Sequence, residues 1–157
     1  MWYNVGMDSV YILLAFTLGW FIAQSAKIII ALVMRKGKIT FPELMDLLMK
    51  SGGMPSSHTA CFTAASLTIG FRCGFDSAIF ALAVAMTVII VYDATNVRYA
   101  VGQQGKLLNK IVSMSEAQKA KPLKLVEGHT VPQAIVGFII GVAIAFTLQY
   151  LTFSKLF

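Results

Sequence analysis

Long apolar runs make this chain a membrane protein. Four of them, over about residues 9–34, 55–71, 76–99 and 130–153, are predicted to be membrane-spanning helices. The chain is 57% hydrophobic and only 13% charged, which is too apolar for an ordinary soluble domain. We therefore expect an all-α fold. It would be one transmembrane domain over residues 1–157, a bundle of about four transmembrane helices with short interfacial helices between them.

The cations of the chain are distributed unevenly between the links that join these spans. Residues 35–54 and 100–129, together with Arg98, hold ten of the 13 lysines and arginines, whereas the opposite side holds Arg72 and Lys155. The positive-inside rule places the cation-rich links in the cytoplasm and both termini outside, in the cell inner (plasma) membrane. The net charge of +6 is interpreted as topology and contact with anionic lipid. No nucleic-acid motif is present in the sequence.

A stretch rich in glycine, serine and proline stands directly before the second apolar run. It reads Ser51-Gly52-Gly53-Met54-Pro55-Ser56-Ser57-His58-Thr59-Ala60. Proline and serine favour a helix start, where serine oxygens cap free amides, and glycine lets the backbone approach a ligand. Because exposed amides at a helix start attract phosphate, the stretch predicts an anion site beside His58. A capped membrane helix with an interfacial histidine is the alternative.

Alternating spans bring further polar groups to the membrane face that carries His58. These groups are Lys27, Lys50, Asp93, Asn96, Arg98, Glu127 and His129. Polar groups in or beside membrane helices need partners, and a charge inside a span usually indicates function. For Lys27 the alternative is a side chain that extends to the membrane interface. The convergence of four helix ends favours a single site on the cytoplasmic face.

Two histidines near helix starts suit phosphoryl transfer. One imidazole can attack phosphorus and form a phosphohistidine, while the other protonates the leaving oxygen. The transferred group also needs positive charge and fixed donors. The candidates are Lys27, Lys50, Arg98, Ser56, Ser57 and the amides around Gly53. Asp93 or Glu127 could orient a histidine or hold the arginine. We expect no cofactor; magnesium stays open, but two histidines and two acids form a small ligand set without metal-binding spacing.

Three motifs resemble the divergent type 2 phosphatidic acid phosphatases, distant relatives of acid phosphatases and vanadium haloperoxidases. They are Gly52-Gly53-Met54-Pro55-Ser56-Ser57-His58, Tyr92-Asp93-Ala94 with Val97-Arg98, and Gly128-His129-Thr130. The resemblance covers nearly the whole chain. It implies that His129 is the nucleophile and His58 the general acid, with Ser57 where the superfamily has glycine. It also implies that Lys27 or Lys50, with Arg98, binds phosphate.

The resemblance also has departures. The superfamily has aspartate four residues after the nucleophile, and the divergent family often has glutamate, but Gln133 stands there in this chain. Glutamine can accept an N–H bond, yet it has no charge to stabilise an imidazolium. The lysine-arginine-proline first motif is absent in its usual form. A homodimer could complete the site.

We therefore expect a membrane phosphatase that hydrolyses a phosphomonoester or diphosphate lipid headgroup. Phosphatidate, phosphatidylglycerophosphate and an isoprenoid phosphate are the candidate substrates, and membrane lipids are the other partners. A headgroup-binding or lipid-handling protein with weak or no turnover is the first alternative, favoured by Gln133. A small transporter or channel subunit is the second, disfavoured because the sequence has no inverted repeat.

Overall fold

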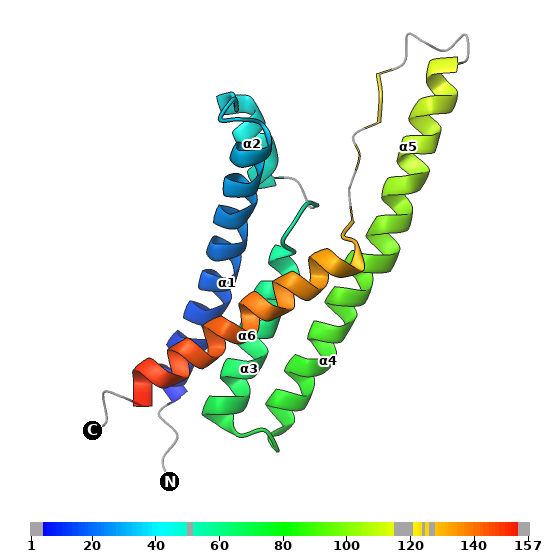
Figure 1. The fold of residues 1–157 in the computed structure, drawn as a ribbon. Coiled ribbons are helices and arrows are strands. Elements are labelled where there is room, and N and C mark those ends of the chain that lie inside the picture. The colour runs from blue at the N-terminus through cyan, green and yellow to red at the C-terminus, as the bar shows by residue number, and fades with distance from the viewer. Residues whose placement is uncertain (1–4, 50–51, 115–120, 124, 126–127, 154–157) are drawn as a thin grey trace.

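A computed structural model describes residues 5–49, 52–114, 121–123, 125 and 128–153 of the chain. The described residues form helices and turns, and no strand occurs among them. In chain order the helices are α1 (Val5–Met34), α2 (Phe41–Met49), α3 (Ser57–Cys73), α4 (Ala78–Tyr92), the π-helical turn η1 (Asp93–Val97), α5 (Arg98–Met114) and α6 (Val131–Phe153). The prediction of an all-α protein is confirmed for this part of the chain (Figure 1).

Three helical stretches of the described chain are long and apolar enough to cross a membrane. They cover Met7–Met34, Ala78–Met114 and Val131–Phe153. The helix α3, expected as the second span, has only 17 residues. By helical rise it covers about 25 Å, less than the roughly 30 Å of a bilayer's hydrocarbon core. The prediction of about four membrane helices is therefore approximate.

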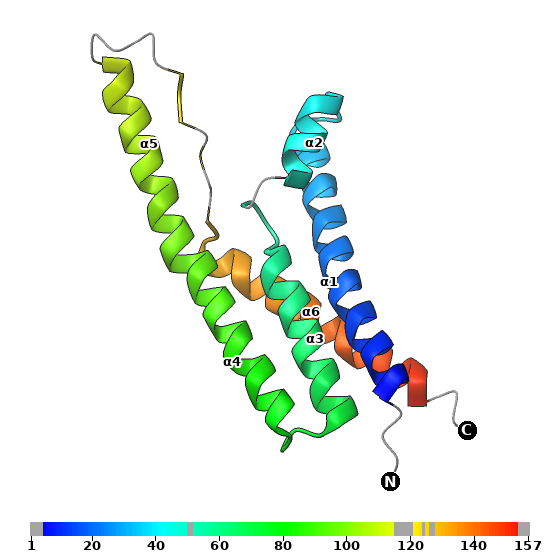
Figure 2. The same ribbon diagram turned by 180° about the vertical axis from the view of Figure 1, so that it is seen from behind.

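The helix α3 lies at the centre of the bundle, where it packs against α1, α4 and α6 (Figures 1 and 2). Thr59, Thr63, Ser66 and Thr68 of α3 are all buried against these neighbours. The Ser66 hydroxyl, for example, lies 2.7 Å from that of Thr87 on α4. Because α3 faces protein and not lipid, it can carry hydroxyls where a lipid-facing span would carry aliphatic side chains.

Glycines allow α1 and α6 to approach the α3 backbone closely. A Cβ added at Gly137 would collide with the carbonyl oxygen of Ser56, and one added at Gly141 would lie 2.7 Å from that of Ala60. On the other side, a Cβ at Gly19 would lie 2.8 Å from an α3 Cα atom. The spacing of Gly137 and Gly141, four residues apart on α6, thus allows tight packing, and α3 is the helix it contacts.

The helices α4 and α5 form one continuous stretch through the η1 turn (Figure 1). We expected the third span to end near Tyr99 and a link to begin at residue 100. The helix instead continues to Met114, because Arg98 N–H bonds to the Asp93 carbonyl and keeps the backbone helical through η1. The chain then returns along α5, where Asn109 Nδ2 donates to the Leu123 carbonyl at 3.0 Å.

The short helix α2 begins with a capping box formed by Thr40 and Glu43. Glu43 accepts hydrogen bonds from Thr40 N–H at 2.9 Å and from the Thr40 hydroxyl at 2.8 Å, which caps the helix start. The same carboxylate pairs with Arg35 at 3.0 Å. Near its other end, α2 is tied to α1 because Gln24 Nε2 donates to the Leu48 carbonyl at 2.9 Å. The link after α1 is therefore folded back against that helix.

At the opposite end of the bundle, Arg72 of α3 joins two neighbouring helices. Its Nε lies 3.8 Å from Asp8 Oδ1, and its guanidinium lies 3.8 Å from the centre of the Tyr11 ring. Its Nη2 donates to the Thr152 hydroxyl at 3.4 Å. The start of α1 and the end of α6 are thus held at the same end of α3 (Figure 2).

Candidate active site

Three segments that are far apart in the sequence meet at the other end of the bundle. They are the turn before α3, the η1 turn and the residues before α6. His129 N–H donates to the Ala94 carbonyl of η1 at 2.9 Å, and Ser56 N–H donates to the Gln133 carbonyl at 3.1 Å. These backbone bonds bring the rings of His58 and His129 to a centroid distance of 6.4 Å, with their planes at 61°. The two predicted catalytic histidines are therefore neighbours.

The hydrogen bonds of His129 establish which ring nitrogen carries the proton. Nδ1 lies 3.1 Å from the Gly53 carbonyl oxygen and 3.4 Å from Oε1 of Gln133. A carbonyl oxygen can only accept, so Nδ1 is protonated and donates. Oε1 of Gln133 also accepts Thr130 N–H at 3.1 Å, which assigns the amide oxygen to this position. The neutral imidazole consequently has its lone pair on Nε2.

Nε2 of His129 is buried and has no hydrogen-bond partner among the described residues. The whole residue is only 2% exposed. An unpaired buried nitrogen costs on the order of 1–3 kcal/mol, so a site that keeps one is suited to a ligand. Burial lowers the pKa of His129 below its ordinary value, and the charge of Lys27 lowers this pKa further. The imidazole is therefore neutral near pH 7, and its lone pair can attack an electrophile.

Lys27 is the buried cation of the site. Its side chain on α1 is 5% exposed, and Nζ has no hydrogen-bond partner among the described residues. Its charge acts on both His58 and His129, so it lies within electrostatic range of both rings. This burial excludes a side chain that extends to the interface. An ammonium group that is held in the bundle with no carboxylate partner among the described residues is suited to bind an anion.

Asp93 and Arg98 form an ion pair across the η1 turn. Arg98 Nε donates to Asp93 Oδ2 at 2.6 Å, and the two side chains are 40% and 43% exposed. A π-helical turn pairs residues five apart, which explains why these two side chains share a face. Both charges act on His58. Asp93 was expected either to orient a histidine or to hold the arginine. In the structure its carboxylate pairs with Arg98.

Ser56 caps α3, as the sequence predicts. Its Oγ accepts Thr59 N–H at 3.3 Å and the Thr59 hydroxyl at 3.0 Å, and the residue is fully buried. Ser57 opens the helix and is also buried. Gly53 has a φ of +80°, which glycine adopts without strain. We expected Gly53 to present its amide to phosphate; its carbonyl is the group that orients His129.

The structure thus brings most of the predicted site residues to one end of the bundle. These are Lys27, Gly53, Ser56, Ser57, His58, Asp93, Arg98, His129 and Gln133. Lys50 and Glu127 lie outside the described residues. Within the described part of the chain, no group of three or more histidine, cysteine or acidic side chains could hold a metal ion.

Two contacts that hold the site were not anticipated from the sequence. One is the bond from His129 N–H to the Ala94 carbonyl. The other is the approach of Gly128 to the Tyr99 backbone, which any Cβ at Gly128 would prevent. Glycine directly before the histidine was the only signal of this close approach. Beside it, Gly53, Lys106 and Gln133 help to line a polar recess of about 210 Å³.

Comparisons with known proteins agree with the motifs. The profile of a family described as the Divergent PAP2 family matches residues 9–144, which include all three motifs. The chain is 34% identical over 119 residues to the uncharacterized membrane protein YuiD of Bacillus subtilis (strain 168). That similarity covers 67% of this chain and 75% of the relative. No solved structure matches the chain.

Proposed function

The chain belongs to the Divergent PAP2 family, and from this premise we propose that it is a membrane phosphatase acting on lipid phosphates. One observation carries the proposal: Nε2 of His129, which no described residue pairs, belongs to an imidazole whose centre is 6.4 Å from that of His58. An attacking nitrogen needs to be about 3 Å from phosphorus, and an acid about 3 Å from the leaving oxygen. A single phosphoryl group therefore suits the separation of the two rings.

The reaction has two steps. In the first, Nε2 of His129 attacks phosphorus, the bond from phosphorus to the lipid oxygen breaks, and His58 gives its proton to that oxygen. The products are a lipid alcohol and a phosphohistidine. In the second step, water attacks phosphorus, the phosphorus–nitrogen bond breaks, and His58 takes the proton from water. Inorganic phosphate leaves, and both histidines return to their initial protonation states.

Positive charge near the transferred phosphoryl group stabilises the transition state. A loose phosphoryl transition state carries its charge on three equatorial oxygens, so catalysis depends on placed cations and donors. Lys27 supplies a buried ammonium within range of both rings. Arg98 is held by Asp93 beside His58, where it can bind the more exposed phosphate oxygens. The site lies on the cytoplasmic face, since the cation-rich links adjoin it.

Replacing Lys27 by methionine is expected to separate stability from activity. Methionine has nearly the same length but removes a buried charge that has no described partner, so the free energy of unfolding should rise by about 1 kcal/mol or more. Phosphate release should fall by about 10²-fold, because a transition-state cation is lost. Unfolding in detergent and a phosphate assay measure the two effects. Ile29→Met, on the exposed face of α1, is the control and should change neither.

The proposed activity is tested by phosphate release from purified protein in detergent. Phosphatidate, phosphatidylglycerophosphate and a polyprenyl phosphate are the substrates, each with and without a chelator and with vanadate. We expect hydrolysis of at least one of them, inhibition by vanadate as a phosphate mimic, and no effect of the chelator. Absence of release from every lipid phosphate would reject the enzyme, and loss of activity on chelation would reject the metal-free mechanism.

A headgroup-binding protein without turnover is the second candidate, and the observation that favours it is the neutral side chain of Gln133. Its Oε1 accepts from His129, but it cannot stabilise an imidazolium by charge. Under this alternative the protein would bind a lipid phosphate at Lys27 and Arg98 and release no inorganic phosphate. Equilibrium binding of phosphatidate in detergent, measured beside the phosphate assay, separates the two candidates.

The pH profile provides a further prediction. The neutral form of His129 attacks, so the acid limb of activity should follow a pKa that burial holds below its ordinary value of about 6.5. The proton that His58 must give sets a separate basic limb. Gln133→Glu puts a carboxylate beside Nδ1, which favours imidazolium and raises the pKa of His129. The acid limb of kcat/KM should therefore move to higher pH, while the plateau rises. Gln133→Leu, as the control, should lower the plateau of kcat/KM without moving its acid limb to higher pH. An acid limb that does not move in Gln133→Glu would contradict the contact between residue 133 and Nδ1 of His129.

A further inference from the structure

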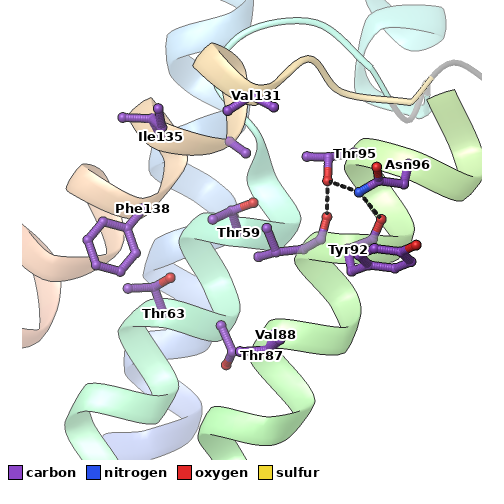
Figure 3. A pocket seen from close by; sticks show the side chains of 12 residues that line it. Thr59, Thr63, Thr87, Val88, Tyr92, Thr95, Asn96, Val131, Ile135 and Phe138 are labelled. Atoms are coloured by element: carbon purple, nitrogen blue, oxygen red, sulfur yellow. Dashed lines mark hydrogen bonds between the residues drawn. The ribbon is translucent and has the colours of Figure 1, made fainter.

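A groove runs from the site down the side of the bundle, between α4 and α6 with α3 as its floor (Figure 3). Its volume is about 490 Å³. Both α4 and α6 pack on α3, so the space between them is closed at the back and open at the front. The groove is bordered by stretches apolar enough to span a membrane, so its opening faces hydrocarbon.

The residues that line the groove change in character along its length. Thr59, Thr95 and Asn96 line the end near the site, where Thr59 directly follows His58 on α3. Farther along, Val88 of α4 and Phe138 of α6 form the two walls, and both are more than half exposed. The lining is therefore mostly apolar, with Thr59, Thr95 and Asn96 at the end beside the two histidines. A molecule with a phosphate head, a polar linkage and an apolar chain has this same order.

Thr63 is exceptional among the helical threonines of the groove and of the bundle. Six others donate their hydroxyl to the carbonyl four residues earlier at 2.7 to 2.8 Å: Thr17, Thr68, Thr87, Thr95, Thr147 and Thr152. Thr63 also lines the groove, and its hydroxyl is buried and has no hydrogen-bond partner among the described residues. The residue is 3% exposed. The usual bond within the helix is not made, so a donor is left for a ligand in the groove.

We propose that this groove holds an acyl chain of a glycerolipid phosphate, with the Thr63 hydroxyl donating to the ester carbonyl. The proposal rests on the proposed function, because it places the phosphate of that same lipid between the two histidines. Thr63 lies five residues after His58, about 7.5 Å along the helix axis. In a glycerolipid, the glycerol carbons separate the phosphate from its ester carbonyls by a few bonds. A polyprenyl phosphate has only hydrocarbon at this depth and would leave the hydroxyl unpaired.

The first test asks whether an acyl chain occupies the groove. A phosphatidate with a photoreactive diazirine in its acyl chain is incubated with the protein in detergent, and the labelled residues are identified by mass spectrometry. We expect labels on Val88, Ile135 and Phe138 that unlabelled phosphatidate removes. The readout needs no turnover, so it remains informative if the phosphatase assay fails. Labelling spread evenly over lipid-facing residues such as Leu13 would overturn the proposal. The finding that a second copy of the chain fills the groove would overturn it as well.

Two matched double variants test the same point by filling the groove. Val88→Trp with Ile135→Trp narrows it from both walls at exposed positions, whereas Ile89→Trp with Ile139→Trp adds the same bulk to the same helices outside it. The first pair should lower photolabelling at Phe138 at least fivefold, and the second pair should leave it unchanged. Equal labelling in the two pairs would reject the groove as the chain site.

Thr63→Val tests the carbonyl contact, since valine keeps the shape and removes only the hydroxyl. The ligand pair is a diacyl phosphatidate and its dialkyl ether analogue, which differ by the carbonyl groups. In competition for photolabelling, the wild type should prefer the ester by about three- to tenfold, the range of one hydrogen bond. Thr63→Val should abolish that preference, and Thr147→Val, outside the groove, should retain it. A preference that survives in Thr63→Val, or that the wild type lacks, would overturn the role of Thr63.

Discussion

Phosphate release is expected to fall by at least about 10³-fold when His129 is replaced by alanine. The change removes the nitrogen that attacks phosphorus, and no phosphohistidine can then form at this position. Nε2 of His129 is buried and unpaired among the described residues, and its tautomer is set through Nδ1 by Gly53. Both conditions point to a nitrogen prepared to attack. The measurement is the initial rate of phosphate release from the best lipid substrate in detergent.

Two controls separate lost chemistry from lost folding in this variant. Free imidazole should restore part of the activity of His129→Ala, because it can occupy the space left by the side chain; a misfolded site would not respond. His58→Ala should slow the lipid substrate by about 10²- to 10⁴-fold but should slow p-nitrophenyl phosphate far less, since that leaving group needs no acid. A wild-type rate in His129→Ala, or an equal loss on both substrates in His58→Ala, would refute the assigned roles.

Gly137→Leu is expected to destabilise the protein by about 3 kcal/mol or more and to remove activity with it. A Cβ at Gly137 would collide with the carbonyl oxygen of Ser56, which is backbone and cannot rotate away. The start of α6 must then move from α3. The bond from Ser56 N–H to the Gln133 carbonyl would open, and His129 would move away from His58. The midpoint of unfolding in detergent measures the first effect.

Ala143→Leu is the matched control for Gly137→Leu. It adds a leucine to the same helix at an exposed position, where we expect a change within about 0.5 kcal/mol and normal activity. Photolabelling or vanadate binding would show whether any folded Gly137→Leu protein keeps its site. Equal stability of the two variants would mean that the close approach of α6 to α3 does not limit folding.

Particular residues show which features of the structure could be predicted from the sequence. The cap at Ser56 and the close packing at Gly137 and Gly141 could be predicted, because both depend on local chemistry. Whether α3 crosses the membrane and where the helix of the third span ends could not be decided from the sequence. Both depend on what surrounds a helix, since α3 is shielded by its neighbours and α5 continues the helix of α4 beyond the predicted boundary at Tyr99.

The sequence by itself determined that this chain folds as membrane helices with histidines, a lysine, acids and an arginine near four helix ends. Apolar runs decide which segments enter a bilayer, whatever their neighbours are. Only the tertiary structure decided that Nδ1 of His129 donates to Gly53, that Lys27 is buried, and that the Thr63 hydroxyl beside the groove has no partner in the described part of the chain. These properties depend on how each helix is rotated about its axis and how closely it approaches the next. That choice is made by backbone contacts at glycines between helices remote in sequence.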